Sequence, residues 1–218
     1  MATREVSMPG PFHKVGRRLG VLGLVSVLTL GAFVPTAGAT APRVVDPIAE
    51  VASGALVLMN SSSASVMSPS YLAWREQLAE EVGERLGIDP AELLTAWDRA
   101  DAEHQTALMA ALAQLGAPYR RRSADPDKGF DCSGLTAYAW GQAGVSLARN
   151  STRQFREGDA RNIFTAQAGD LLRYPGHVMM WLGVGQAVVH SPEPGRVVEV
   201  RNISDAALRR SSFFDPSE

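Results

Sequence analysis

The sequence predicts an α+β fold in which helices come first and an antiparallel sheet follows. Two observations predict it. From Tyr71 to Gly116, apolar residues recur at near-helical spacing, and after Leu171 short apolar or alternating runs are separated by turn sequences. The chain has 218 residues, of which 45% are hydrophobic and 20% charged. That is an ordinary globular composition with room for one domain and a smaller appendage.

The amino terminus has the pattern of an export signal over residues 1–39. A basic stretch ends at Arg17-Arg18, an apolar run follows from Leu19 to Val34, and small residues suited to a signal peptidase end at Ala39. We therefore expect a mature protein that begins at Thr40 and is secreted to the extracellular side. The apolar run is shorter than the roughly 20 residues of a membrane-spanning helix. A retained membrane anchor is the alternative.

Two segments are expected between this signal and the main domain. Residues 40–70 are predicted to be a flexible linker because Asn60–Ser70 is rich in serine, although Pro47–Met59 could form a short helix. Residues 71–104 are predicted to be a helical segment that precedes a domain spanning residues 105–218.

The helical segment carries its own start and stop signals. Gly87 ends the first predicted helix, and Asp89-Pro90 can begin the next, because aspartate caps helices and proline suits the first helical position. The apolar pattern continues to Gly116 and fits either one long helix or two helices that break near Asp101. Such a segment either packs on the domain that follows or restrains its site; packing is the usual role of an amphipathic helix.

The main domain continues with one more helix and then strands. After a loop from Ala117 to Phe130, a helix is predicted from Cys132 to Ala143. Four strands are then predicted, separated by proline- and glycine-rich turns: Leu171–Tyr174, His177–Leu182, Ala187–His190 and Val197–Arg201.

The single cysteine, Cys132, lies where chemistry is favoured. Asp131 is a natural cap, so Cys132 falls in the first turn of its helix, where the unpaired N–H groups and the helix dipole favour a thiolate. The same N–H groups can stabilise an oxyanion when the thiolate attacks a carbonyl. Ser133 and Gly134 are small and leave the thiol approachable. The alternative is a buried cysteine that pins the helix to the sheet.

A cysteine nucleophile needs a base, and the predicted mature chain has three histidines. His104 lies in the amphipathic helical region and is expected at the solvated surface. A two-residue loop at Val184-Gly185 would place His177 and His190 diagonally on one face of a hairpin. A loop shifted by one residue would place them directly opposite, and a three-residue loop would separate them onto opposite faces.

Five segments, in order and spacing, resemble the NlpC/P60 cell-wall cysteine peptidases. They are Ala113–Tyr119, Phe130–Leu135, Ala168–Leu171, Gly176–Val178 and Val189–Ser191. The resemblance implies a papain-like domain, with helices packed on a central antiparallel sheet, that needs no metal or cofactor. It implies hydrolysis of peptidoglycan stem peptides, typically at the bond between D-isoglutamate and the following diamino acid.

The resemblance also implies roles for particular residues. Cys132 becomes the nucleophile, His177 the general base and His190 the residue that orients the imidazole. Residues that match substrate-lining positions, or that adjoin the nucleophile, are Tyr119, Asp131, Ser133, Arg149 and Ser151. The spacing between the two histidines is one residue longer than the resemblance leads us to expect, which bears on His190.

Partners follow from charge and from the resemblance. The chain lacks the basic stripe of a nucleic-acid-binding protein, so the expected partner is the peptidoglycan stem peptide, and contact with a membrane is expected only through the signal segment. The sequence leaves the oligomeric state open. Two other functions remain: a different papain-like amidase or acyl transferase acting on the wall, and a non-catalytic wall-binding scaffold.

Overall fold

The computed structural model describes residues 46–61 and 68–217. The expected export signal at residues 1–39 and the expected first mature residue, Thr40, lie outside the described residues. The described residues belong to one compact unit. In the part of the chain that the structure describes, no helix combines the length and the apolar character that a membrane span requires.

Four helices precede the main domain: α1 (Pro47–Met59), α2 (Pro69–Leu86), α3 (Pro90–Arg99) and α4 (Ala102–Leu112). The first three begin with proline after a capping residue whose side chain accepts a backbone N–H. α2 ends at Gly87, whose φ of 67° is left-handed as such a cap requires. α3 and α4 are two separate helices because Ala100 is extended and Asp101 caps α4. This decides between the two alternatives left open by the sequence.

α1 is a packed helix rather than part of a flexible linker. Ile48, Ala52 and Ala55 are fully buried, and they belong to the same hydrophobic core as residues of α4 and of the sheet. The expectation of a linker over residues 40–70 is therefore wrong for Pro47–Met59, because apolar residues at helical spacing there bury against neighbouring helices. Residues 40–45 and 62–67 lie outside the described part.

The sheet has six antiparallel strands in the order β3-β8-β4-β5-β6-β7. Their bounds are β3 (Asp159–Arg161), β4 (Leu171–Tyr174), β5 (His177–Trp181), β6 (Ala187–His190), β7 (Glu199–Asn202) and β8 (Ser212–Asp215). The strands predicted for β4, β5 and β6 agree within one residue. β7 starts two residues later than Val197, and β3 and β8 were not predicted because they are short and carry no clear alternation.

A two-stranded hairpin lies apart from the main sheet. It consists of β1 (Ala124–Asp125) and β2 (Gly129–Phe130), paired antiparallel. It falls in the loop predicted between Ala117 and Phe130 and leads directly into α5 (Cys132–Gln142).

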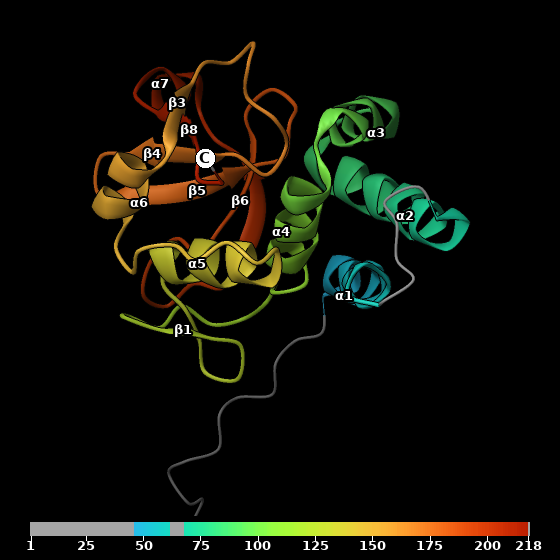
Figure 1. Ribbon diagram of the computed structural model, residues 1–218, viewed down its shortest axis with the longest axis horizontal. Helices are drawn as coiled ribbons and strands as arrows, with labels where there is room; N and C mark the ends of the chain where they lie inside the picture. Colours follow the sequence, from blue (N-terminus) through green and yellow to red (C-terminus); the bar gives the residue numbers. More distant parts are fainter. Residues whose placement is uncertain (1–45, 62–67, 218) are drawn as a thin grey trace, which may run out of the picture. The chain divides into compact units, whose positions relative to one another are not determined.

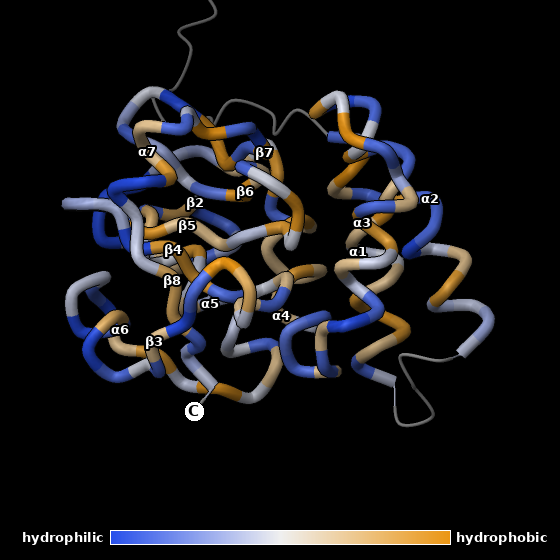
Figure 2. Tube along the Cα trace, turned by 90° about the horizontal axis from the view of Figure 1, so that it is seen from above, coloured by the Kyte–Doolittle hydropathy of each residue, from blue (hydrophilic) through white to orange (hydrophobic). Residues whose placement is uncertain are grey.

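The two faces of the sheet pack against different partners (Figures 1 and 2). Val178, Met180 and Val189 join the large core formed with α1–α5. Met179 and Trp181 join a smaller core on the other face, with side chains from α7 (Asp205–Arg209) packed against it. β5 is buried on both faces. Its first residue, His177, therefore lies where the buried strand meets the surface, and the packing around the strand fixes its position.

The helical segment and the sheet share one core. The indole Nε1 of Trp97, on α3, donates to the backbone oxygen of Leu182 at 2.9 Å, and Trp97 is fully buried. The boundary expected between residues 104 and 105 falls inside α4. This supports a packing role for the helical segment.

Candidate active site

Cys132 is the first residue of α5, as the sequence predicts, and it is partly exposed. Asp131 caps this helix: one carboxylate oxygen accepts the N–H of Gly134 at 2.8 Å. A Cβ added at Gly134 would lie 1.9 Å from the backbone oxygen of Ser123. Only glycine therefore lets the loop before the helix approach this closely and hold the thiol at the helix start.

The two histidines face one another across β5 and β6. His177 begins β5 and His190 ends β6, and Nε2 of His177 lies 2.8 Å from Nδ1 of His190. The strands pair Met180 with Val189, and this register continued places His190 opposite Met179, with His177 on the diagonal. Of the three alternatives, the register is the one expected for a two-residue loop at Val184-Gly185.

The backbone next to His177 contacts the thiol. α5 packs on β5, and the backbone N–H of Val178, the residue after His177, is a hydrogen-bond donor to Cys132. Nε2 of His177 is engaged by His190, so Nδ1 is the ring nitrogen left for the thiol. The arrangement can deprotonate a thiol at a helix start and hold the resulting imidazolium in one orientation.

Burial governs the charges at this site. Burial and the neighbouring His190 lower the pKa of His177 to about 4. Burial, followed by the charges of Arg201 and Arg196, lowers the pKa of His190 to about 4. Both imidazoles are therefore neutral at neutral pH.

The thiol is also neutral at rest. Burial raises the pKa of Cys132 above its ordinary value, and the backbone N–H groups of Val178 and Ser133 act in the opposite direction without overcoming it. The expectation that the helix start yields a thiolate is therefore wrong for the free protein, because loss of hydration outweighs the donors. The site holds a neutral thiol beside a neutral imidazole.

Asp131 organises the residues next to the thiol. Its carboxylate forms a two-pronged ion pair with Arg149, at 2.9 and 3.0 Å, and it accepts the N–H of Arg122 at 2.7 Å. Ser133 donates to the backbone oxygen of Arg149 at 2.9 Å and lies 3.1 Å from its guanidinium. Asp131, Ser133 and Arg149, all expected near the substrate, thus form one connected group.

The remaining two expected residues lie at the borders of this group. Burial and the nearby Cys132 raise the pKa of Tyr119, which places its hydroxyl within electrostatic reach of the thiol. Ser151 is the first residue of α6 (Ser151–Glu157), one residue after the capping Asn150. α6 packs against α5.

Two buried or half-buried residues at this site were not expected. Gln154, on α6, is buried and donates to the backbone oxygens of Ser133 and Ala148, which ties α6 to the start of α5. Glu199, on β7, pairs across the strands with His190. Glu199 could be identified as a partner of His190 only from the register of β6 and β7, and the local sequence does not determine that register.

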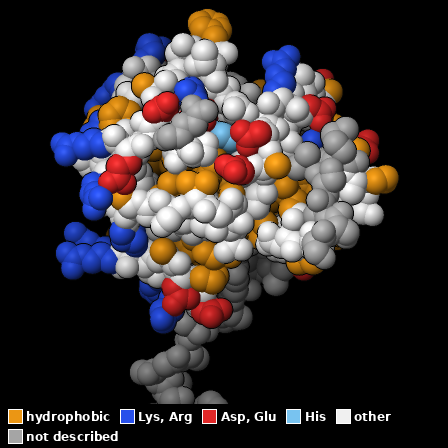
Figure 3. Space-filling model, in the orientation of Figure 1, with side chains coloured by type: hydrophobic (Ala, Val, Ile, Leu, Met, Phe, Trp, Pro, Cys, Tyr) orange, Lys and Arg blue, Asp and Glu red, His pale blue; other side chains and the backbone are white. Residues whose placement is uncertain are grey.

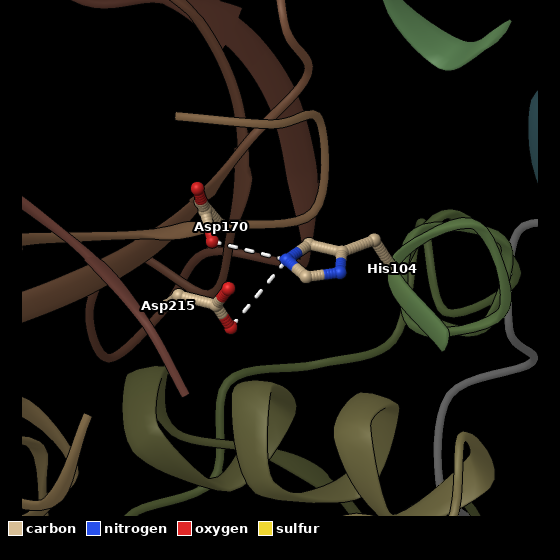
Figure 4. A group of neighbouring side chains, drawn as sticks. All are labelled: His104, Asp170 and Asp215. Carbon is tan, nitrogen blue, oxygen red and sulfur yellow. Dashed lines mark hydrogen bonds and ion pairs between the residues drawn. The ribbon is translucent and has the colours of Figure 1, made fainter. Parts of the chain in front are cut away.

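His104 is fully buried, so its expected position at the solvated surface is wrong. Figure 4 shows its imidazole pointing from α4 to two carboxylates: Nε2 lies 3.1 Å from Asp170 and 3.5 Å from Asp215. Nδ1 lies 2.9 Å from Asp101. Burial alone would lower the pKa of His104, but the hydrogen bonds to Asp170 and Asp101 and their charges raise it to about 9. His104 is therefore a buried cation that ties α4 to the sheet.

Among the described side chains, His104, Asp170 and Asp215 form a group that could hold a metal ion, with ligand atoms within 4.8 Å of one another. Their oxygens already have protein partners. Asp215 accepts from Arg161 at 2.9 Å and from Ser217 at 2.6 Å, and Asp170 accepts the N–H of Gln167 at 2.7 Å. A protonated His104 and one arginine balance the two carboxylates, so an ion-pair network accounts for the cluster.

Basic side chains gather along one side of the molecule, where α6 and the β1–β2 hairpin lie (Figure 3). Arg120, Arg121 and Arg122, in the loop before the hairpin, are exposed. They lie in the loop predicted from Ala117 to Phe130.

The structure is an α+β fold in which Cys132 begins a helix packed on the strand that starts at His177, and His177 is hydrogen-bonded to His190. Residues 116–213 match the NlpC/P60 family. The resemblance to this family therefore has support from a match over somewhat less than half of the chain, and the α+β architecture expected from the sequence is confirmed.

The chain is similar to parts of longer proteins. A probable endopeptidase of Mycobacterium tuberculosis is 37% identical over 106 residues, which are 47% of this chain and 27% of the relative. The bifunctional muramidase/DL-endopeptidase CwlT of Bacillus subtilis is 34% identical over 93 residues, 38% of this chain and 28% of the relative. This chain thus spans about a quarter of the length of each of these relatives. A crystal structure of an NlpC/P60 family protein from Bacillus cereus has a TM-score of 0.47 and 28% identity, covering 51% of this chain and 39% of that one.

Proposed function

We propose that this protein is an exported cysteine endopeptidase that hydrolyses peptidoglycan stem peptides, at the bond between D-isoglutamate and the following diamino acid. The single observation that carries the proposal is the hydrogen-bonded pair of His177 and His190 beside Cys132 at the start of α5. The relatives described as endopeptidases support the reaction class. Export rests on the pattern of residues 1–39.

The first half-reaction follows from the neutral resting pair. Cys132 Sγ attacks the scissile carbonyl carbon while its proton passes to Nδ1 of His177. Nε2–H of His177 donates to Nδ1 of His190, which holds the imidazolium in place. The developing oxyanion is stabilised by backbone N–H groups at the start of α5. His177 then protonates the leaving amine, and a thioester with Cys132 remains.

The second half-reaction regenerates the enzyme. A water molecule loses a proton to His177 and attacks the thioester carbonyl, and the thiol leaves with that proton returned to it. Beside the thiol, the connected group of Asp131, Ser133 and Arg149 offers both charge signs to the polar backbone of a stem peptide, with Tyr119 and Ser151 at its borders.

Purified muropeptides digested with the protein, with products read by mass, test the function. Wild type is expected to release the fragment that ends in D-isoglutamate. Cys132→Ala should remove all hydrolysis while keeping the wild-type circular dichroism spectrum, because only the thiol supplies the nucleophile. His177→Ala should be nearly as damaging because no group then protonates the leaving amine. Wild-type product release by Cys132→Ala would refute the cysteine mechanism.

The same experiment separates the other functions. An amidase would release the whole stem peptide from the sugar, and an acyl transferase would yield products of higher mass than the substrate. A non-catalytic scaffold would bind wall fragments and leave their masses unchanged. Intact-mass measurement of exported material tests the signal: we expect the mature chain to begin at Thr40, and a retained segment 1–39 would indicate an anchor.

A further inference from the structure

One ring nitrogen of the histidine pair lacks a hydrogen-bond partner among the described residues. Nε2 of His190 is buried and unpaired, although the other nitrogen of the same ring contacts His177. A buried polar atom without a partner costs about 1–3 kcal/mol. A carboxylate oxygen of Glu199 lies 3.4 Å from this nitrogen, within ion-pair distance.

The position of Glu199 follows from the sheet. β6 and β7 pair His190 directly with Glu199, so both side chains lie on the same face of the sheet. The side chain of Glu199 is only 20% exposed and is held by Arg196 at 2.5 Å and Arg201 at 3.9 Å. The carboxylate is thus kept beside His190 by two guanidinium groups.

This contact determines the tautomer of His190. When His177 takes the thiol proton on Nδ1, its Nε2 must donate, so Nδ1 of His190 must accept. A neutral His190 that accepts on Nδ1 carries its proton on Nε2. The negative charge of the Glu199 carboxylate, 3.4 Å from this nitrogen, favours a proton there and so favours this tautomer over the other.

We propose that Glu199 is a positioning residue of the cysteine–histidine site: it holds His190 as the Nε2–H tautomer, and His190 in turn directs Nδ1 of His177 to the thiol. The inference deepens the proposed peptidase function and rests on it for its kinetic consequences. The tautomer itself is a property of the folded chain and is measurable without substrate.

The charged and titratable groups that face the histidine pair come from α5, β7 and the turn before β7. They are Cys132, Glu199, Arg201 and Arg196. The two arginines disfavour a protonated histidine pair, and the carboxylate of Glu199 opposes them. Glu199→Gln keeps the shape of the side chain and leaves the two positive charges uncompensated.

The kinetic test compares Glu199→Gln with Glu193→Gln, a matched change on an exposed residue of the preceding turn. Glu199→Gln should lower kcat about 10-fold with KM unchanged, the size typical of losing an orienting partner. The limb of the pH profile that reports the histidine pair should move to lower pH. Glu193→Gln should match wild type in both. A uniform loss at all pH values, or a profile identical to wild type, would overturn the role of Glu199.

A second measurement keeps the inference independent of activity. Nitrogen-15 spectra of the imidazoles distinguish the two neutral tautomers. Wild-type His190 should carry its proton on Nε2, and Glu199→Gln should populate the Nδ1–H form. Wild-type His190 in the Nδ1–H form would overturn the inference. If wild type does not cut muropeptides, the proposed function fails, while this spectrum still decides the role of Glu199.

Discussion

At the scale of single residues, the site combines a thiol and two imidazoles that are all neutral at rest. Burial is the first cause in each case: it raises the pKa of Cys132 and lowers that of His177 and His190 to about 4. A helix start is often sufficient to favour a thiolate. Here the loss of hydration outweighs that effect, so charge separation is expected only when substrate arrives.

Alkylation of Cys132 in the free protein tests this charge state. Iodoacetamide reacts with the thiolate, so the rate should rise with pH through and beyond the ordinary thiol range. Its pH profile should show no acid plateau of the kind that a thiolate–imidazolium pair produces. Because Cys132 is the single cysteine, the reaction reports one site. A rate that stays high down to pH 5 would contradict a neutral thiol.

The role of His190 predicts a graded response to substitution. His190→Ala removes the acceptor for Nε2 of His177 and should lower kcat by about 10–100-fold, the range seen when an orienting partner is lost. His190→Asn should be milder because an amide oxygen can still accept. The expected order of kcat is wild type, then Asn, then Ala. Normal turnover by His190→Ala would mean that another residue orients His177.

At the scale of elements, the helical segment behaves as part of the domain. α3 reaches the far end of β5 through Trp97 and Leu182, whereas His177 begins the same strand. At about 3.3 Å per strand residue, these two ends lie roughly 17 Å apart. The contact is therefore remote from the thiol, which favours the packing role over restraint of the site.

Trp97→Phe measures that packing. The substitution removes the N–H that pairs with the buried backbone oxygen of Leu182 and should lower the free energy of unfolding by about 2 kcal/mol. Activity below the unfolding temperature should stay at the wild-type level. Trp74→Phe is the control, since Trp74 is 38% exposed and should cost far less. Faster muropeptide digestion by Trp97→Phe would instead support restraint.

At the scale of the whole molecule, two sets of buried histidines make stability depend on pH in opposite directions. The pKa of His104 is raised to about 9, so its stabilising contribution is complete below its unfolded pKa near 6.5 and is lost as pH rises toward 9. The pKa of His177 and His190 is lowered to about 4, so the folded state loses stability as pH falls from about 6.5 toward 4.

Urea unfolding from pH 4 to pH 10 checks these signs. Wild type should be most stable near pH 6–7, between the two windows of loss. His104→Asn should be less stable at neutral pH. Its free energy of unfolding should fall much less than that of wild type between pH 7 and 9. Arg153→Gln, on the exposed face of α6, serves as a control and should keep the wild-type slope. An unchanged alkaline slope in His104→Asn would rule out a raised pKa for this histidine.

Much of the fold could be predicted because its signals are local. Asp131 and Gly134 specify a helix start at Cys132 through capping and close approach, and the strands β4, β5 and β6 show as apolar runs between turn residues. β3 and β8 have three and four residues, and they form strands only because neighbours supply hydrogen bonds. β3 is polar and mostly exposed, and β8 has two apolar residues between polar ones, so neither shows the apolar run that marks β4 and β6.

His104 shows where prediction from the sequence failed. A histidine in an amphipathic helical region, next to Glu103, fits the solvated face. Its burial depends on Asp170 and Asp215, which lie 66 or more residues further along the chain. No local pattern predicts that those carboxylates lie beside α4. Protonated His104 is stable in the interior because both carboxylates are close to it.

The sequence by itself determined the class of fold, the cysteine at the helix start and the two histidines on neighbouring strands, because capping, turn chemistry and hydrophobic period act over a few residues. The tertiary structure alone decided the strand register that joins His177 to His190, the contact of His190 with Glu199 and the neutral state of the thiol. Register and burial depend on which distant segments pack together. The pKa of each buried group depends on them too, because packing sets its hydration and the charges around it.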